Sequence, residues 1–301
     1  MNVGIMNFDD MPYKHYQSND TPFATGFRMH DSAQLSHWLS LATKIAHQAG
    51  TILKKYWGNL QSIQEKDFPG DLVTEADKQS EQFIVNALQK KFTSHQILAE
   101  ESGLFTTESE FIWVVDPLDG TTNYAHQYPM VAISIALLHQ HIPLIGIVYN
   151  PLTEEFFSAA QGLGAYLNQK PIRVSNCTSL KDSLLATGFA YDRRETQDNN
   201  YAEFCRFTHL TQGVRRAGSA ALDLAYVACG RLDGYWERGL RPWDIAAGTL
   251  LVQEAGGRAS SYNLDPIDWS SGRILASNSF LHEKMSQELL FPTQFKKLSL
   301  N

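Results

Sequence analysis

The chain has 301 residues, with 25 lysine and arginine side chains against 32 aspartate and glutamate side chains, and its formal net charge is −7. This acidic balance argues against general binding to nucleic acids or to membrane surfaces. With 43% hydrophobic and 19% charged residues, the composition is that of an ordinary globular protein. The length suits one large domain or two joined halves.

The cysteines and the first thirty residues indicate the compartment. Cys177, Cys205 and Cys229 are odd in number and form no Cys-x-x-Cys pair, which predicts reduced, buried thiols in a cytosolic protein. Residues 1–30 show no signal-peptide pattern, and no apolar run reaches the ~20 residues of a membrane helix. We interpret residues 1–30 as a flexible extension outside the fold, because they show no hydrophobic period.

Two helices and then a series of strands are predicted in the first part of the chain. Apolar residues at helical spacing follow a capping Asp31 or Ser32 and predict a helix that ends near Gly58. A second helix is predicted from about Asp77 to Lys91. The strands that follow are expected at 112–116, 131–138, 144–149 and 155–159.

Strands and helices alternate after residue 180, which predicts a second sheet with helices around it. The expected fold class is therefore α+β, with a metal-binding half from 31 to 180 and a substrate-specificity half from 181 to 301. We expect the two halves to form one compact unit with the site between them. The expected strands are 184–187, 232–237 and 274–276, and the expected helices are 202–210, 219–229, 243–255 and 281–289.

The most informative segment is Asp116-Pro117-Leu118-Asp119-Gly120-Thr121-Thr122, which follows an apolar run. Two carboxylates three residues apart leave a strand on a turn, where proline restricts φ and glycine permits a tight bend. Hard divalent cations prefer oxygen ligands, and the N–H groups of a helix start suit a phosphate group. The segment indicates phosphate chemistry with metal ions, while its Asp-Pro and Asp-Gly pairs alone are equally typical of a plain turn.

Two further segments favour the metal interpretation, and each also has a simpler one. Glu100 and Glu101 follow a strand-like stretch and form either a solvated acidic turn or, through Glu100, a metal site shared with Asp116. Asp244 lies in the first turn of a helix that starts at Pro242. An acid at that position complements the helix dipole, and a rigid helix start also suits a metal ligand.

A third segment runs from Asp71 to Asp77 and has two interpretations. One is a capped helix start, with Thr74 or Asp77 as the cap. In the other, Asp71 accepts a hydrogen bond from the hydroxyl of Thr121 and so helps to polarise that hydroxyl.

Taken in this order, these segments resemble the inositol monophosphatase family of Mg²⁺-dependent, Li⁺-sensitive phosphatases. The resemblance covers about residues 32–290 and depends on Trp-Val-Val-Asp-Pro-Leu-Asp-Gly-Thr-Thr-Asn at 113–123, Pro-Trp-Asp-Ile-Ala-Ala-Gly at 242–248, and the run from 215 to 226. It implies a layered αβαβα sandwich, usually dimeric. It also implies two or three Mg²⁺ ions and a cytoplasmic enzyme that hydrolyses inositol monophosphate with an activated water.

The resemblance also implies roles for single residues. The tighter metal position is expected at Glu100, Asp116 and the carbonyl of Leu118, and a second at Asp116, Asp119 and Asp244. The expected catalytic residues are Glu100, Thr121 and Asp71, of which Asp71 and Thr121 orient the water. The residues expected to contact the substrate are Glu100, Leu118, Asp119, Gly120, Thr121, Gly218, Ser219, Ala220, Glu237 and Asp244.

Several alternatives stay open. Histidinol phosphate, or a sugar or adenosine bisphosphate, is also a possible substrate, and Glu237 has the alternative of being an exposed strand residue. A different class of function is a regulatory protein that binds RNA or the transcription machinery. We interpret His126 as structural rather than catalytic. A local group of arginines, which suits substrate steering, a dimer interface or a partner, occupies positions 206, 215, 216, 231, 238 and 241.

Overall fold

The computed structural model describes residues 31–66 and 68–291, so the N-terminal extension expected at 1–30 lies outside the described residues. Within these ranges no helix is both long and apolar enough to cross a membrane. Asp31 accepts a hydrogen bond from the N–H of Ala33 and caps the first helix, as expected. Thr74 and Asp77 form a capping box at the start of the second helix.

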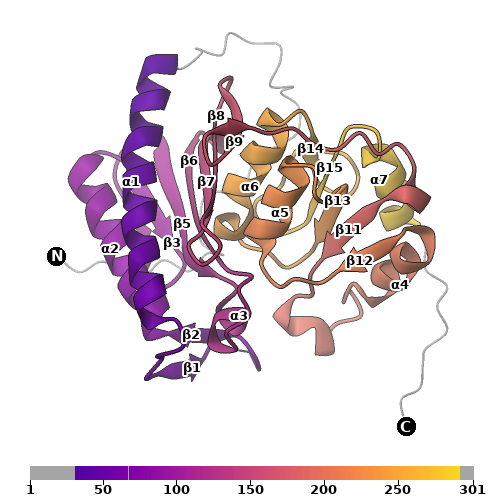
Figure 1. Cartoon of the computed structure of the whole chain (residues 1–301), viewed down its shortest axis with the longest axis horizontal. Helices are drawn as coiled ribbons and strands as arrows, with labels where there is room; N and C mark the ends of the chain where they lie inside the picture. Colours follow the sequence, from indigo (N-terminus) through magenta and orange to yellow (C-terminus); the bar gives the residue numbers. More distant parts are fainter. Residues whose placement is uncertain (1–30, 67, 292–301) are drawn as a thin grey trace.

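Five layers of helices and sheets make up the molecule (Figure 1). α1 and α2 cover one face of an eight-stranded sheet, and α5 and α6 lie between this sheet and a five-stranded sheet. α4 and α7 cover the other face of the five-stranded sheet. The predicted αβαβα sandwich is therefore confirmed. The helices are α1 (Ser32–Tyr56), α2 (Glu75–Lys91), α3 (Thr121–Ala125), α4 (Tyr201–Leu210), α5 (Ala220–Ala228), α6 (Pro242–Glu254) and α7 (His282–Leu290).

The eight-stranded sheet has the order β10-β9-β8-β7-β6-β5-β3-β4. All neighbouring strands in it are antiparallel except β3 and β5, which are parallel. Its strands are β3 (Gln96–Ala99), β4 (Gly103–Phe105), β5 (Phe111–Asp119), β6 (Ala132–His139), β7 (Ile142–Asn150), β8 (Glu155–Ala160), β9 (Gly164–Leu167) and β10 (Lys170–Pro171).

The five-stranded sheet has the order β12-β11-β13-β15-β14, and β11 is parallel to both of its neighbours. Its strands are β11 (Leu184–Thr187), β12 (Gly213–Arg215), β13 (Gly234–Glu237), β14 (Arg258–Ser260) and β15 (Ile274–Ser277). A separate hairpin and two 3₁₀ turns complete the described structure. These are β1 (Ile63–Glu65) with β2 (Leu72–Thr74), η3 (Leu180–Asp182) and η4 (Tyr191–Arg194).

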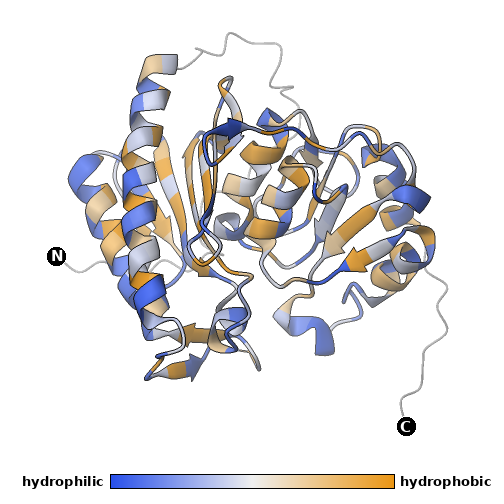
Figure 2. Cartoon of the chain, in the orientation of Figure 1, coloured by the Kyte–Doolittle hydropathy of each residue, from blue (hydrophilic) through white to orange (hydrophobic). Residues whose placement is uncertain are grey.

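The central strands are buried on both faces, which explains why they are apolar without alternation. On β5, Trp113 and Val115 pack toward α1 and α2, whereas Ile112 and Val114 pack toward α5 and α6. Figure 2 shows hydrophobic residues along these strands and on α5 and α6. Because one continuous core joins the first sheet to helices of the second half, the two halves are packed as one unit. The boundary at residue 180 stays an interpretation.

The predicted helices and strands are present with small shifts at their ends, and the strands without a prediction are short. β1, β2, β4, β10, β12 and β14 have two or three residues each, and β9 has four. Such strands are too short to show a period of two, and they pair because the chain around them is already placed. The prediction of buried thiols is wrong, since Cys205 is exposed and Cys177 and Cys229 are partly exposed; all three are free thiols.

α6 approaches the eight-stranded sheet at Gly146 of β7, and this contact allows a test of the layer packing. A Cβ atom on Gly146 would lie 2.6 Å from the carbonyl oxygen of Ala247, which is main chain and cannot move aside. We expect Gly146→Ala to lower the free energy of unfolding by about 1–3 kcal/mol, because it overpacks this interface. Urea denaturation measures the change.

Gly213→Ala is the matched control for Gly146→Ala. A Cβ atom on Gly213 would lie 3.1 Å from the flexible end of Arg215 and 3.7 Å from a methyl group of Leu184. We expect a change within about 0.5–1 kcal/mol. An equal loss in the two variants would contradict the close packing of α6 on β7.

Candidate functional site

A β-bulge near the end of β5 brings two carboxylates to the same face of the sheet. Asp116 is opposite Ser134 and Asp119 is opposite Ala132, which leaves one extra residue on β5. Residues three apart in a regular strand point to opposite faces, and the extra residue cancels that alternation. The sequence predicts a turn at this point, whereas the strand continues through a bulge that contains Pro117.

Asp116 is the most deeply buried carboxylate of this group, with 2% of its surface exposed. Its Oδ1 accepts a hydrogen bond from the N–H of Leu118 at 2.9 Å. Burial raises the pKa of Asp116 well above its ordinary value, and the charges of Glu100, Asp119 and Asp244 raise it further. Four acids from three segments therefore lie close enough to repel one another.

Asp119 links the first half of the chain to the second. Its Oδ2 accepts hydrogen bonds from Ser219 Oγ at 2.6 Å and from the N–H of Ala221 at 2.8 Å. Burial raises the pKa of Asp119 to about 6, although these two donors act in the opposite direction. The start of α5, with Ser219 and Ala220, is thus held directly against the β5 carboxylate.

Asp244 comes from the start of α6, as predicted. Pro242 is the first residue of α6, and Asp244 Oδ2 accepts a hydrogen bond from the N–H of Arg241 at 2.7 Å. Ser134 of β6 donates to the carbonyl of Trp243 at 2.8 Å and fixes this helix start on the sheet. Burial, followed by the charge of Asp119, raises the pKa of Asp244 well above its ordinary value.

Glu100 follows β3 and is paired with a lysine that the sequence analysis missed. The ammonium group of Lys66 lies 2.8 Å from Glu100 Oε1 and 2.6 Å from Glu101 Oε1. Burial lowers the pKa of Lys66, but the two carboxylates outweigh it and the net shift is upward. Because a side-chain cation is already drawn to this edge of the acid group, positive charge is favourable there.

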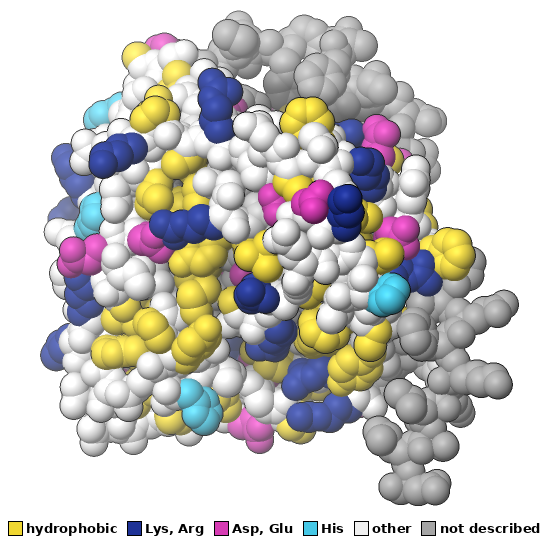
Figure 3. All heavy atoms as spheres, turned by 45° about the vertical axis from the view of Figure 1, so that its right-hand side comes forward, with side chains coloured by type: hydrophobic (Ala, Val, Ile, Leu, Met, Phe, Trp, Pro, Cys, Tyr) yellow, Lys and Arg dark blue, Asp and Glu magenta, His cyan; other side chains and the backbone are white. Residues whose placement is uncertain are grey.

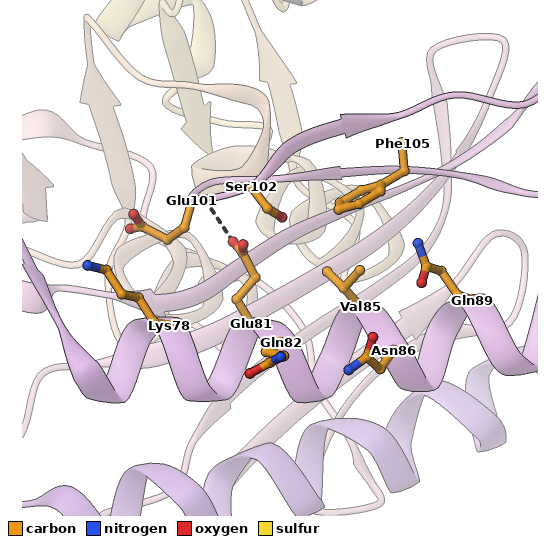
Figure 4. Close-up of a pocket in the computed structure, with 9 residues that line it drawn as sticks. All are labelled: Lys78, Glu81, Gln82, Val85, Asn86, Gln89, Glu101, Ser102 and Phe105. Atoms are coloured by element: carbon orange, nitrogen blue, oxygen red, sulfur yellow. Dashed lines mark hydrogen bonds between the residues drawn. The ribbon is translucent and has the colours of Figure 1, made fainter. Parts of the chain in front are cut away.

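The main chain beside Glu100 is held from α2. Glu81 Oε2 accepts a hydrogen bond from the N–H of Glu101 at 2.7 Å, drawn as the dashed line in Figure 4. Glu81 and Glu101 line a cavity of about 390 Å³ between α2 and the β3–β4 hairpin. The Glu81 bond restricts the turn that presents Glu100 to the site.

The hydroxyl of Thr121 donates its hydrogen bond to Asp77. The prediction that it donates to Asp71 is therefore wrong. Thr121 Oγ1 donates to Asp77 Oδ1 at 2.8 Å and also lies 3.1 Å from the carbonyl oxygen of Leu118. Asp77 is 0% exposed, and burial raises its pKa to about 6. Its other oxygen accepts from the N–H of Thr74 at 2.9 Å, so one carboxylate both caps α2 and holds the site threonine.

Gly120 and Gly218 meet where the two halves touch. Gly120 has a φ of 89°, and a Cβ atom there would lie 2.8 Å from the carbonyl oxygen of Met130 and 3.2 Å from that of Gly218. The side-chain amide of Asn123 donates to the carbonyl groups of Met130, Ala217 and Gly218 at 2.8, 2.9 and 3.2 Å. These three hydrogen bonds, the Asn123 latch, join the β5–α3 segment to the chain before α5.

Glu237 is buried at the end of β13, so the alternative of an exposed strand residue is wrong. Its exposed fraction is 9%, and the hydroxyl of Tyr235 donates to its Oε2 at 2.5 Å. Burial raises the pKa of Glu237 to about 7, while Tyr235 and the guanidinium group of Arg216 act against that rise. A second buried acid, Asp223 of α5, has its pKa raised by burial and by the charge of Glu237.

The structure therefore brings together predicted residues that lie in or next to β3, β5, α3, α5 and α6, and it adds five that were missed. Asp77 is part of a capping box, which has a local sequence signal. Its contact with the hydroxyl of Thr121 has no such signal. Lys66 and Asn123 act through contacts with distant segments, whereas Tyr235 bonds Glu237 two residues along the same strand. The missed residues are Lys66, Asp77, Asn123, Asp223 and Tyr235.

The donor chemistry of the acid group fits a hard divalent cation. Carboxylate and carbonyl oxygens are the ligands that Mg²⁺ and Ca²⁺ prefer, and burial together with the charges of neighbouring acids raises the pKa values of Asp116 and Asp244. Across residues 31–66 and 68–291, no three His, Cys, Asp or Glu side chains already surround one point as ligands. Each carboxylate is instead turned to a donor of the protein itself.

Three of the six arginines are paired with acids on separate elements. Arg206, Arg231 and Arg238 bond Glu288 at 3.4 Å, Glu155 at 2.5 Å and Asp192 at 2.7 Å, respectively. On the face shown in Figure 3, lysine and arginine side chains stand among hydrophobic ones. Because each of these three arginines is paired with an acid, none of them contributes an unpaired positive charge to the surface. His126 is exposed and ends α3.

Comparisons with known proteins agree on one family. The model described as "Inositol monophosphatase family" matches residues 34–294. A protein of Synechocystis sp. named inositol-1-monophosphatase is 56% identical over 264 residues, which cover 87% of this chain and 92% of that protein. A Pseudomonas aeruginosa protein named Nus factor SuhB is 43% identical, with 80% and 91% covered. A solved inositol monophosphatase structure from Anabaena (Nostoc) sp. is 52% identical with a TM-score of 0.79, covering 85% of this chain and 96% of that one.

The Asn123 latch gives a testable prediction about how the halves are joined. Asn123→Ala removes the donor to three carbonyl groups and leaves them without this partner. We expect the free energy of unfolding to fall by about 1–3 kcal/mol, measured by urea denaturation. Asn86→Ala, which removes an exposed amide on α2, is the control and should have an effect within about 0.5 kcal/mol. Equal stability of Asn123→Ala and the unmodified protein would contradict the latch.

Proposed function

The chain belongs to the inositol monophosphatase family, and from this premise we propose that it is a phosphoric monoester hydrolase that releases phosphate from inositol monophosphate. One observation carries the proposal. Both halves of the chain contribute to a group of four acids, Glu100, Asp116, Asp119 and Asp244. This group lies beside Thr121, which is the first residue of α3. Such a group of acids suits cations that bind a phosphate dianion.

We propose that this group holds two or three Mg²⁺ ions through Glu100, Asp116, the Leu118 carbonyl, Asp119 and Asp244. The support is the oxygen donor set and the raised pKa values of the acids. When bound, the ions supply positive charge to the phosphate group and lower the pKa of a water molecule. No nucleophilic side chain is then needed.

The residues of the chain supply orientation and a proton acceptor. The N–H groups of Gly120 and Thr121 are proposed to bind phosphate oxygens at the start of α3. The Thr121 hydroxyl is proposed to hold the attacking water, because its own proton is already directed to Asp77 Oδ1. With a pKa raised to about 6, the Asp77 carboxyl is ionised near neutral pH, so it can accept the Thr121 proton while the Thr121 oxygen takes a proton from the attacking water.

The alcohol part of the substrate is assigned to the second half. Gly218, Ser219 and Ala220 precede or begin α5, and Ser219 touches Asp119, so this segment borders the acid group. Glu237 is a buried acceptor suited to a hydroxyl of the alcohol. Histidinol phosphate and sugar or adenosine bisphosphates stay as rival substrates, and an assay with each of them in parallel decides between them.

We extend the proposal to a cytosolic homodimer. The free thiols of Cys177, Cys205 and Cys229 support a reducing compartment, and the family resemblance supports the dimer. A role with RNA or the transcription machinery has a 43% identical relative, named Nus factor SuhB, in its favour. The net charge of −7 and the ion-paired arginines favour the enzyme instead.

Asp119→Asn tests the proposed function. The amide keeps an oxygen that accepts from Ser219 and Ala221, so the fold should persist, but it is a poorer Mg²⁺ ligand than the carboxylate. We expect kcat for inositol 1-phosphate to fall by about 10²-fold or more. Asp182→Asn, an exposed acid in η3, is the control. A folded Asp119→Asn variant with full activity at saturating Mg²⁺ would show the metal assignment to be wrong.

The raised pKa values predict how Mg²⁺ and pH act together on stability. A carboxyl group whose pKa is higher in the folded chain stabilises the fold below its unfolded pKa, and this contribution is lost as pH rises through the folded value. For Asp119 and Asp77 that window runs from about 4 to about 6. The metal-free protein therefore loses stability in this window, and Mg²⁺ should restore the part that comes from Asp119 by binding its ionised carboxylate.

We expect the rise in Tm caused by 10 mM Mg²⁺ to be larger at pH 7.5 than at pH 5 by roughly 2–4 °C, which corresponds to a tenfold change in apparent affinity. Differential scanning calorimetry at both pH values measures it. His282, whose pKa burial lowers to about 4, shifts stability in the opposite direction with pH but equally with and without Mg²⁺. An equal Mg²⁺ effect at both pH values would contradict binding to these acids.

A further inference from the structure

The carboxylate of Glu237 lies in space that a side chain at position 188 would occupy. β11 and β13 are parallel with Thr187 opposite Trp236, so Gly188 follows β11 beside Glu237. A Cβ atom on Gly188 would lie 2.1 Å from Glu237 Oε2 and 2.2 Å from Oε1. Glycine is required here for space, since the φ of Gly188 is outside the left-handed region.

Tyr235 holds one oxygen of the same carboxylate. It is two residues before Glu237 on β13, so the two side chains leave the same face of the sheet, and its ring is 0% exposed. Its single hydroxyl proton is donated to Glu237 Oε2 at 2.5 Å. Within the described part of the chain, no hydrogen bond is donated to Glu237 Oε1.

The strand ends around this carboxylate are fixed by Asn200. Its side-chain amide donates to Thr187 Oγ1 at 2.8 Å and to the carbonyl of Gly188 at 2.7 Å, and its Oδ1 accepts from the indole N–H of Trp236 at 2.7 Å. Asn200 is 4% exposed. Because these bonds tie the end of β11 to the end of β13, the main chain of Gly188 cannot move away to admit a side chain.

We propose that Gly188 and Tyr235 are positioning residues that fix Glu237 with one free oxygen for a substrate hydroxyl, and that they make the site selective for phosphate esters of polyhydroxylated alcohols. A rigid, buried acceptor is left without a partner when the substrate has no hydroxyl to offer, and this penalises such a substrate. This inference rests on the proposed function and names the part of the site that chooses the alcohol.

The experiment measures a selectivity ratio, which is kcat/KM for inositol 1-phosphate divided by kcat/KM for p-nitrophenyl phosphate, an ester whose alcohol has no further hydroxyl. We expect Tyr235→Phe to lower the ratio about tenfold, mainly through a higher KM for inositol 1-phosphate. Gly188→Ala, which displaces the carboxylate itself, should lower the ratio at least as much. Equal losses with both substrates would indicate a merely structural role and overturn the proposal.

Two matched controls and a double variant separate positioning from general damage. Tyr226→Phe removes another tyrosine–glutamate bond, 3.0 Å long, to Glu155, and Gly213→Ala adds a methyl group on β12; neither should change the ratio. In a Glu237→Gln background, Tyr235→Phe should lower the ratio by less than about twofold further, because it acts through Glu237. A full additional tenfold loss would contradict that coupling.

The failure of this proposal can be told apart from failure of the proposed function. If the unmodified protein hydrolyses neither ester, the proposed function is wrong, and a crystal structure of Gly188→Ala still tests the positioning. We expect the Glu237 carboxylate to be displaced in that structure, and a carboxylate in its original place would overturn the proposal. If the unmodified protein hydrolyses both esters with equal kcat/KM, the family assignment stands and the selectivity proposal falls.

Discussion

The repulsion among Glu100, Asp116, Asp119 and Asp244 is the constraint on which the rest of the site depends. Burial and mutual charge raise the pKa of Asp116 and Asp244, so the folded chain keeps these acids together against a free-energy cost. A fold carries such a group only where other interactions outweigh the repulsion. Here those interactions are the packing of α5 and α6 on the eight-stranded sheet and the bonds that join the two halves.

Each acid has a local donor that limits the repulsion. Lys66 neutralises Glu100 from the β1–β2 hairpin side, Ser219 and Ala221 hold Asp119 from α5, and the N–H of Arg241 holds Asp244. These donors come from three different parts of the chain. The site is therefore assembled only when both halves are folded and in contact, which couples the integrity of the site to the integrity of the whole core.

A division of labour follows from this arrangement. The first half carries the β-bulge, the Thr121–Asp77 pair and most of the acids, all on elements buried in the larger sheet. The second half brings Asp244 and the start of α5 and adds Glu237 at the carboxyl end of a parallel strand. Groups suited to phosphate thus come mainly from one half, and the acceptor suited to the alcohol comes from the other.

The sequence by itself determined the α+β class and the approximate bounds of the long helices and central strands, and the resemblance of its motifs to a known family implied the layered sandwich and the segments proposed for the site. It could do so because apolar runs, helix caps and the Asp-Pro-Leu-Asp-Gly-Thr-Thr segment are local patterns. Only the tertiary structure decided that Thr121 bonds Asp77 rather than Asp71, that the chain passes Pro117 in a bulge, and that Gly188 makes room for Glu237. These facts depend on which distant segments meet, and spacing along a chain does not show which residues of another segment a side chain will contact.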